Sequence, residues 1–256
     1  MGEKPKNRLA ELREKTYALL SLPSCVVNEV LSRMGLLDQE EREYRAQHEA
    51  GHALVYLLEG KVMEKAEIHS LRGMTCARLN QLFGEDVFNA GEVNINDEDD
   101  RQFAKEHPER NAIMYLAGMA STKDPKHGLF FDHILSEGLA NGVDEPWDDI
   151  SVPYVYIQDR FQAINQRQPT NVEVSEIFHD VLNEIRSIFS EDKFARALTQ
   201  VKILIKEHRL KRAINDTILN ALYSGGFSPD DLAAMQQKLL SIDVDQIVQR
   251  HGSIAA

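Results

Sequence analysis

The chain has 256 residues, 43% of them hydrophobic, with a formal net charge of −12 and a sequence pI near 5.2. Such a chain can bury a sizeable core in one large or two small domains. The acidic balance argues against nucleic acid and anionic membranes as partners, because both attract basic patches. Neither a membrane-spanning apolar run nor a signal peptide is evident, so the sequence predicts a soluble, cytoplasmic protein without a transmembrane segment.

The N-terminal part is predicted to form three helices. Apolar residues recur at helical spacing over residues 7–20 and 24–37, and Pro23 separates these two segments. A third helix is predicted at about 39–59, since strong helix formers lead into it and Gly60 offers a C-terminal stop. The two earlier helices would form a lead-in to the third.

The best candidate for β structure follows this third helix. Residues 66–71 and 75–79 flank Arg72-Gly73-Met74, a pattern that predicts a β-hairpin. The first of these strands is expected to offer an open edge to an extended peptide. Residues 84–101, with an acidic run at 97–100, are interpreted as a solvated loop. Bound calcium is the alternative, but the spacing is not that of an EF-hand.

The rest of the chain is predicted to be helical. Helical patterns cover residues 109–122, 129–141, 147–165, 172–190, 192–211, 213–224 and 228–250. The last segment opens with Ser228 as an N-cap and Pro229 at the first helical position. The sequence therefore predicts a mainly α protein with one small β-hairpin or sheet and no internal repeat.

One short motif points to chemistry. His48-Glu49-Ala50-Gly51-His52 has the form H-E-x-x-H and lies inside the third predicted helix. Residues four apart share a helix face, so both imidazoles can reach one zinc ion at about 2.0 to 2.1 Å. Glu49 lies between them and can take a proton from zinc-bound water, whose pKa falls to about 7. The motif indicates metal-assisted hydrolysis; a chance occurrence among nine histidines is the alternative.

The glycine inside the motif is unexpected. An interior helical glycine costs about 1 kcal/mol relative to alanine, so Gly51 is easier to explain if another backbone or a ligand approaches closely. The apolar neighbours Ala50, Ala53 and Leu54 indicate a largely buried helix. Burying two histidines and a glutamate without partners would cost free energy, which favours a metal site over an ordinary core helix.

A third zinc ligand has to come from elsewhere in the chain. A catalytic zinc site usually has three protein ligands and one open position. The metzincin spacing is absent, because Val55 and Leu58 stand where that pattern requires glycine and histidine. A carboxylate from a later helix is the other option. By residue type alone the candidates are Asp132, Glu137, Asp144, Glu145, Asp148 and Asp149.

Four segments resemble the FtsH-type ATP-dependent zinc metallopeptidases. Residues 46–55 resemble the motif helix of that family, whose signature is H-E-A-G-H followed by alanine. Residues 65–74 resemble its strand and R-G-M turn, 116–120 its L-G-G-R-A segment, and 201–210 a late helix. The likeness spans roughly residues 44–232 and implies the helical fold of the FtsH peptidase domain, with zinc as cofactor.

The resemblance also implies which carboxylate binds zinc. In that family the third ligand is an aspartate in a short N-D-[LI] segment that opens a helix. Asp148-Asp149-Ile150 matches this segment and places Asp149 at the ligand position. The alternative is that both aspartates simply complement the dipole of the helix N-terminus. The interval from His52 to Asp149, 97 positions, is longer than in the family, which predicts an insertion between about 84 and 146.

Three regions follow from this comparison. Residues 1–43 would be an N-terminal helical extension, 44–232 the metallopeptidase-like domain with its insertion, and 233–256 a C-terminal helical tail. The chain shows no G-x-x-x-x-G-K-[ST] motif, so ATP-driven unfolding is not expected from it. The resemblance implies hexameric rings, but the ATPase module partly organises those. A homo-oligomer and a separate AAA+ unfoldase acting in trans are the protein partners left open.

The sequence thus predicts a zinc metalloendopeptidase of the H-E-x-x-H type. His48, His52 and Asp149 would bind zinc, and Glu49 would act as the catalytic base. Peptides or unfolded polypeptides are the expected substrates. Two alternatives stay open: a catalytically silent adaptor or regulator that keeps the fold, and a helical scaffold in which the motif is accidental.

Overall fold

The computed structural model describes residues 39–68, 91–95, 97–122, 148–207, 210 and 212–254. Within these ranges the chain is mostly helical and carries one small sheet, as the sequence predicts. The helices are α3 (Gln39–Leu58), α5 (Asp97–Glu106), α6 (Pro108–Ser121), α8 (Asp148–Asn165), α9 (Asn171–Phe189), α10 (Asp192–Glu207), α11 (Ile214–Ser224), α12 (Pro229–Leu240) and α13 (Val244–Ile254). The predicted helices at 7–20, 24–37 and 129–141 lie outside the described residues.

The motif helix α3 ends where the sequence predicts. Gly60 has a positive φ of 70°, a left-handed conformation that glycine adopts at little cost. The Gly60 N–H donates to the Leu57 carbonyl at 3.0 Å, and the Lys61 N–H donates to the Tyr56 carbonyl at 2.8 Å. These two bonds form a Schellman motif, which satisfies carbonyls that a helix end would otherwise leave unpaired.

The prediction of one helix over 228–250 was wrong, because this segment forms both α12 and α13. Its start is as predicted: Ser228 caps α12 and exchanges hydrogen bonds with Asp231 in a capping box. The break comes at Asp243, whose carboxylate accepts the Gln246 N–H at 2.8 Å and so begins a new helix. Glu109 of α6 accepts the Val244 N–H at 2.8 Å, a long-range contact that the local pattern does not contain.

The sheet pairs β1 (Met63–Ile68) with β2 (Gly91–Ile95) in antiparallel fashion. β1 overlaps the first predicted strand. The second predicted strand, 75–79, lies outside the described residues. The partner of β1 instead comes from 91–95, inside the segment interpreted as a solvated loop, so that interpretation was wrong.

The same segment continues into α5, which the loop interpretation also missed. Residues 97–100, the acidic run of the sequence, form the first turn of this helix. Phe103 is buried at 8% exposure, and α5 packs on α6. A single buried aromatic among the described side chains of α5 gives little periodic signal, because amphipathic helices are recognised by a repeated apolar stripe.

β1 is not an open edge at its centre. Ala66 lies opposite Val93 in the sheet and forms an antiparallel bridge with Leu210 on its other side. The two hydrogen bonds between the Ala66 and Leu210 backbones are both 2.9 Å long. The expectation that an extended peptide pairs with this strand was therefore wrong at Ala66.

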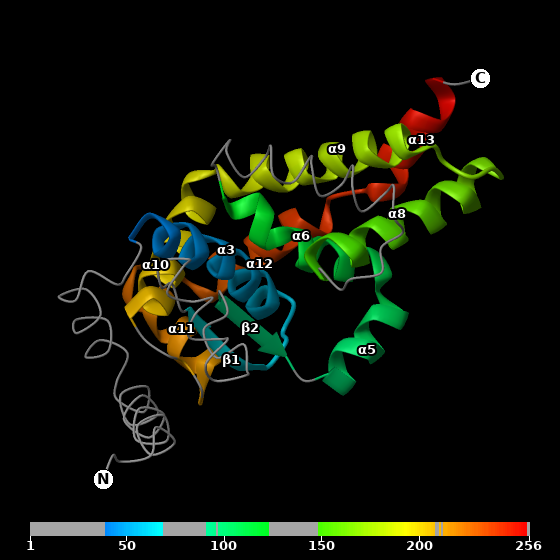
Figure 1. Cartoon of the computed structure of the whole chain (residues 1–256). Helices are drawn as coiled ribbons and strands as arrows, with labels where there is room; N and C mark the ends of the chain where they lie inside the picture. Colours follow the sequence, from blue (N-terminus) through cyan, green and yellow to red (C-terminus); the bar gives the residue numbers. More distant parts are fainter. Residues whose placement is uncertain are drawn as a thin grey trace, which may run out of the picture.

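α3 lies in the middle of the molecule (Figure 1). It packs against α6, α10 and α12, and it contacts both strands of the sheet. α6 in turn packs against α8 and α9. The largest fully buried side chains come from most of these helices and include Leu54, Met114, Phe161, Phe178, Phe194 and Ile214. Burial of each such side chain contributes about 1.5 to 3 kcal/mol, so α3 is held in position from several sides.

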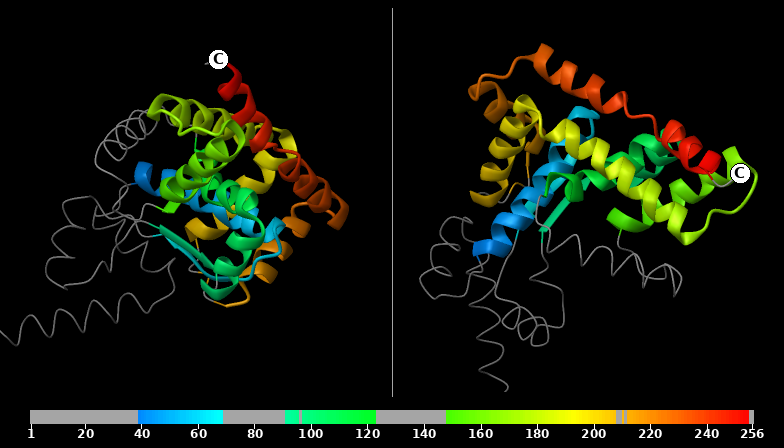
Figure 2. Two further views of the ribbon diagram at one scale, coloured as in Figure 1. Left: turned by 90° about the vertical axis from the view of Figure 1, so that its right-hand side faces the viewer. Right: turned by 90° about the horizontal axis from the view of Figure 1, so that it is seen from above.

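The C-terminal helix α13 packs on α8 and α9 (Figure 2). Arg160 of α8 pairs with Asp245, and His251 Nε2 donates to the Asp180 carboxylate of α9 at 2.9 Å. Val244, Ile247 and Val248 belong to the same core cluster as the motif helix. The predicted end of the metallopeptidase-like domain, residue 232, falls inside α12. The predicted domain limits as a whole stay a prediction.

None of the described helices combines the length and the apolar character that crossing a membrane requires.

Candidate metal centre

The two motif histidines lie on one face of α3 and point toward α8. His52 is almost fully buried, with 7% of its side chain exposed, and His48 is 18% exposed. Their ring centroids are 4.8 Å apart in an edge-on arrangement. The spacing of four residues has therefore brought the two imidazoles together, as the H-E-x-x-H pattern predicts.

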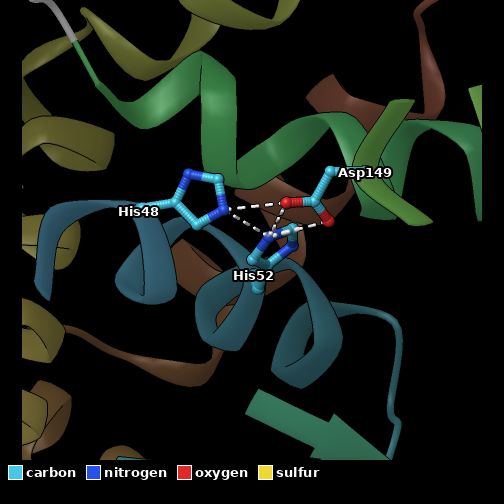
Figure 3. A group of neighbouring side chains, drawn as sticks. All are labelled: His48, His52 and Asp149. Carbon is cyan, nitrogen blue, oxygen red and sulfur yellow. Dashed lines mark hydrogen bonds and ion pairs between the residues drawn. The ribbon is translucent and has the colours of Figure 1, made fainter. Parts of the chain in front are cut away.

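Asp149, in the first turn of α8, meets both imidazoles (Figure 3). One of its carboxylate oxygens lies 2.8 Å from His48 Nε2 and 3.3 Å from His52 Nε2. The two Nε2 atoms are 3.2 Å apart. Among the residues that the structure describes, these three form the group of side chains that could hold a metal ion.

The spacing of the three atoms fits one small ion. Two atoms that each lie about 2.1 Å from a tetrahedral zinc ion are about 3.4 Å apart. The three separations of 2.8, 3.2 and 3.3 Å lie at or slightly below that value. The three atoms thus form one face of a tetrahedron, and their separations need to increase only slightly to hold a zinc ion. The fourth position of that tetrahedron is not taken by any of the three.

A backbone carbonyl fixes the orientation of His52. Its Nδ1 lies 3.1 Å from the carbonyl oxygen of Met114 on α6. A carbonyl can only accept, so Nδ1 carries the hydrogen; when the ring is neutral, Nε2 therefore presents its lone pair to the cluster. This is the arrangement that metal-binding histidines show in proteins. For His48, Nδ1 is buried and has no hydrogen-bond partner among the described residues.

The electrostatics of the cluster favour a positive charge, either a proton or a metal ion, among these three side chains. Burial alone would lower the pKa of His52, but the Asp149 carboxylate outweighs burial and raises the pKa of His52 to about 9. Burial would likewise raise the pKa of Asp149, yet the imidazoles of His52 and His48 hold that pKa well below its ordinary value. A lone pair aimed at a carboxylate is repulsive unless a proton or a metal ion lies between them. The donor set, two imidazoles and a carboxylate, suits zinc.

Glu49 has the burial expected of a catalytic base. It is 8% exposed and follows His48 directly on α3. Burial raises the pKa of the Glu49 carboxyl, while the charges of His48 and His52 act in the opposite direction. A carboxyl with a raised pKa binds a proton more strongly, which favours taking a proton from activated water.

The start of α8 positions the third side chain. Asp149 lies in the first turn, where free backbone N–H groups and the helix dipole favour a carboxylate. Pro153, one turn later, has no N–H to offer the Asp149 carbonyl. Of the other carboxylates considered from the sequence, Asp132, Glu137, Asp144 and Glu145 lie outside the described residues. His133 lies outside them too.

The close crossing of α3 and α6 explains the glycine in the motif. A β carbon at Gly51 would lie 2.3 Å from the Ala117 carbonyl oxygen and 2.9 Å from the Ser121 β carbon. Ser121 Oγ donates to the Gln47 carbonyl at 2.6 Å across the same crossing. The expectation that another backbone approaches Gly51 is therefore confirmed.

Replacing Gly51 by alanine is expected to lower the free energy of unfolding by about 2 kcal/mol or more. Overpacking against a rigid backbone costs about 3 kcal/mol, and the better helix propensity of alanine returns about 1 kcal/mol. Urea unfolding of the metal-free protein measures this change. The control is Gly225→Ala, where the three atoms nearest to the new β carbon belong to the flexible end of Gln200. Equal stability of the two variants would contradict the close crossing.

Two contributions of α6 were missed from the sequence. The Met114 carbonyl is a backbone group, so no residue type signals it. Gly118 faces both imidazoles; it lies in the segment 116–120 that resembles the L-G-G-R-A segment, but that likeness assigned it no role.

No family model matches this chain, and no curated protein or solved structure is found to be similar to it. The resemblance to the FtsH-type peptidases therefore stays a prediction that rests on the motifs themselves.

Proposed function

We propose that this protein is a zinc-dependent metalloendopeptidase that hydrolyses peptide bonds in peptides or unfolded polypeptides. The observation that carries the proposal is the meeting of three ligand atoms from α3 and α8 beside the buried Glu49. Residues 48 and 149 are 101 positions apart, so this meeting is a property of the fold and not of local sequence. An accidental motif would not require a distant carboxylate between its two histidines.

The residues of the site divide the chemistry among them. His48, His52 and Asp149 would hold the ion, and His52 is already oriented by the Met114 carbonyl. When bound, zinc would supply Lewis acidity that lowers the pKa of water to about 7. Glu49 would accept the proton of the attacking water and pass it to the leaving amine. The partial exposure of His48 and Asp149, 18% and 32%, leaves the site a way to solvent and substrate.

A catalytically silent adaptor is the alternative proposal. Such an adaptor could keep the ion for stability but would gain nothing from Glu49, whose burial disfavours its charged form. The retained glutamate therefore favours the hydrolase. A separate unfoldase and a homo-oligomer are compatible with either function.

Metal analysis and a proteolysis assay test the proposal together. The protein purified without chelators is expected to carry one equivalent of zinc and to cleave unfolded casein. Removal of zinc with a chelator should abolish cleavage, and added zinc should restore it. Stoichiometric zinc without cleavage would support the adaptor, and absence of stoichiometric zinc would overturn the zinc peptidase.

A further inference from the structure

We propose that Gly118 is a positioning residue of the zinc site, because the lack of a side chain there keeps open the space in which the imidazoles of His48 and His52 meet. This inference rests on the proposed zinc function and adds a residue that touches the ligands from the opposite helix, α6.

The contacts of an added β carbon single out this position. At Gly118 that atom would lie 2.3 Å from His52 Nε2, 2.6 Å from His48 Nε2 and 2.7 Å from His48 Cε1. These distances are far shorter than van der Waals contact. Both nitrogens are the atoms that face the Asp149 carboxylate. Even a methyl group would therefore push the two imidazoles away from the point where the three ligands converge.

The conformation of the helix does not itself require glycine at this position. Gly118 lies in the interior of α6, and positive φ among the described glycines is found at Gly60 and Gly226. Alanine favours a helix more than glycine does, so the backbone alone would select a side chain here. The three nearest atoms to an added β carbon all belong to imidazoles. At Gly51, by contrast, the nearest atoms are those of the Ala117 backbone, so the two glycines serve different purposes.

One face of α6 therefore controls both ring nitrogens of His52. Met114 and Gly118 are four residues apart and share that face. The Met114 carbonyl accepts from Nδ1 at 3.1 Å, and Gly118 leaves room beside Nε2. Together they hold the ring in one orientation while leaving its coordinating nitrogen accessible.

Metal titration of the full-length Gly118→Ala variant tests the proposal. Co²⁺ replaces zinc as a probe, since its absorption spectrum reports tetrahedral coordination. The wild type is expected to show the tetrahedral spectrum and the variant to lose it. Zinc affinity of the variant should fall by at least about 100-fold, the upper range for residues that orient metal ligands. An unchanged cobalt spectrum and zinc affinity would overturn the proposal.

Unfolding of the metal-free proteins separates positioning from simple misfolding. Gly118→Ala is introduced into the wild type and into His48→Ala/His52→Ala, which lacks both imidazoles. The substitution should lower the urea midpoint less in the second background, or raise it, because the groups it displaces are gone. An equal loss in both backgrounds would refute the proposal. Wild-type protein that binds neither ion would refute the zinc function instead, while this comparison would still test the contact of Gly118 with the imidazoles.

Discussion

Replacing Glu49 by glutamine is expected to lower casein hydrolysis by about 100- to 10,000-fold, the usual contribution of a general base, while zinc remains bound. Glutamine has nearly the same shape but cannot accept the proton. Burial raises the pKa of Glu49, so its charge is disfavoured and a neutral amide should be tolerated by the fold. Zinc content, thermal unfolding and initial rates of cleavage are measured on the same preparation.

A glutamate on the same helix provides the matched control. Glu43 also lies on α3, where it pairs with Lys202 and Lys206 at a partly exposed position. Such pairs contribute about 0 to 1 kcal/mol, so Glu43→Gln should change neither zinc content nor the rate of cleavage appreciably. If Glu49→Gln cleaves casein as fast as Glu43→Gln does, Glu49 is not the base.

Replacing Asp149 by asparagine is expected to weaken zinc binding by more than about 100-fold, since even residues that merely orient a ligand contribute 10- to 100-fold. The variant keeps the size of the side chain but removes the negative charge that lies between the two imidazoles. Zinc affinity is measured by competition with a coloured chelator, and the loss of hydrolysis should follow the loss of zinc.

A matching substitution at the neighbouring Asp148 tests whether Asp149 acts as a ligand or only as a carboxylate at a helix terminus. Both aspartates belong to the first turn of α8. Asp148→Asn removes the same charge one residue away and should leave zinc affinity within a few-fold of the wild type. A similar loss in both variants would show that general electrostatics, and not coordination by Asp149, determines the affinity.

Much of the helical architecture could be predicted from local pattern. α9 and α12 begin at recognisable caps, Thr170 and Ser228, and α3 ends at Gly60. What failed depended on long-range contacts. β2 is a strand because it pairs with β1, and Phe103 is the buried side chain among the described residues of α5. Neither relation leaves a periodic mark in the sequence.

The candidate site was predictable to a similar degree. Helical spacing alone requires that His48 and His52 share a face, and the structure agrees. Asp149 could be selected among six carboxylates only through the family resemblance, because no local rule relates residues 97 positions apart. The Met114 carbonyl and Gly118 were out of reach, since their roles exist only once α6 has packed against α3.

The packing of α3 and α8 on a common helix has a consequence for the proposed metal site. α6 packs against both α3, which carries the two imidazoles, and α8, which carries the carboxylate. The side chains of α6 at these two contacts therefore set the distance between the imidazoles and the carboxylate. If the site binds zinc as proposed, side chains of α6 that lie away from it would therefore change its metal affinity and selectivity by changing that distance. Substitutions in α6 would then change the metal affinity of the proposed site while His48, His52 and Asp149 stay the same.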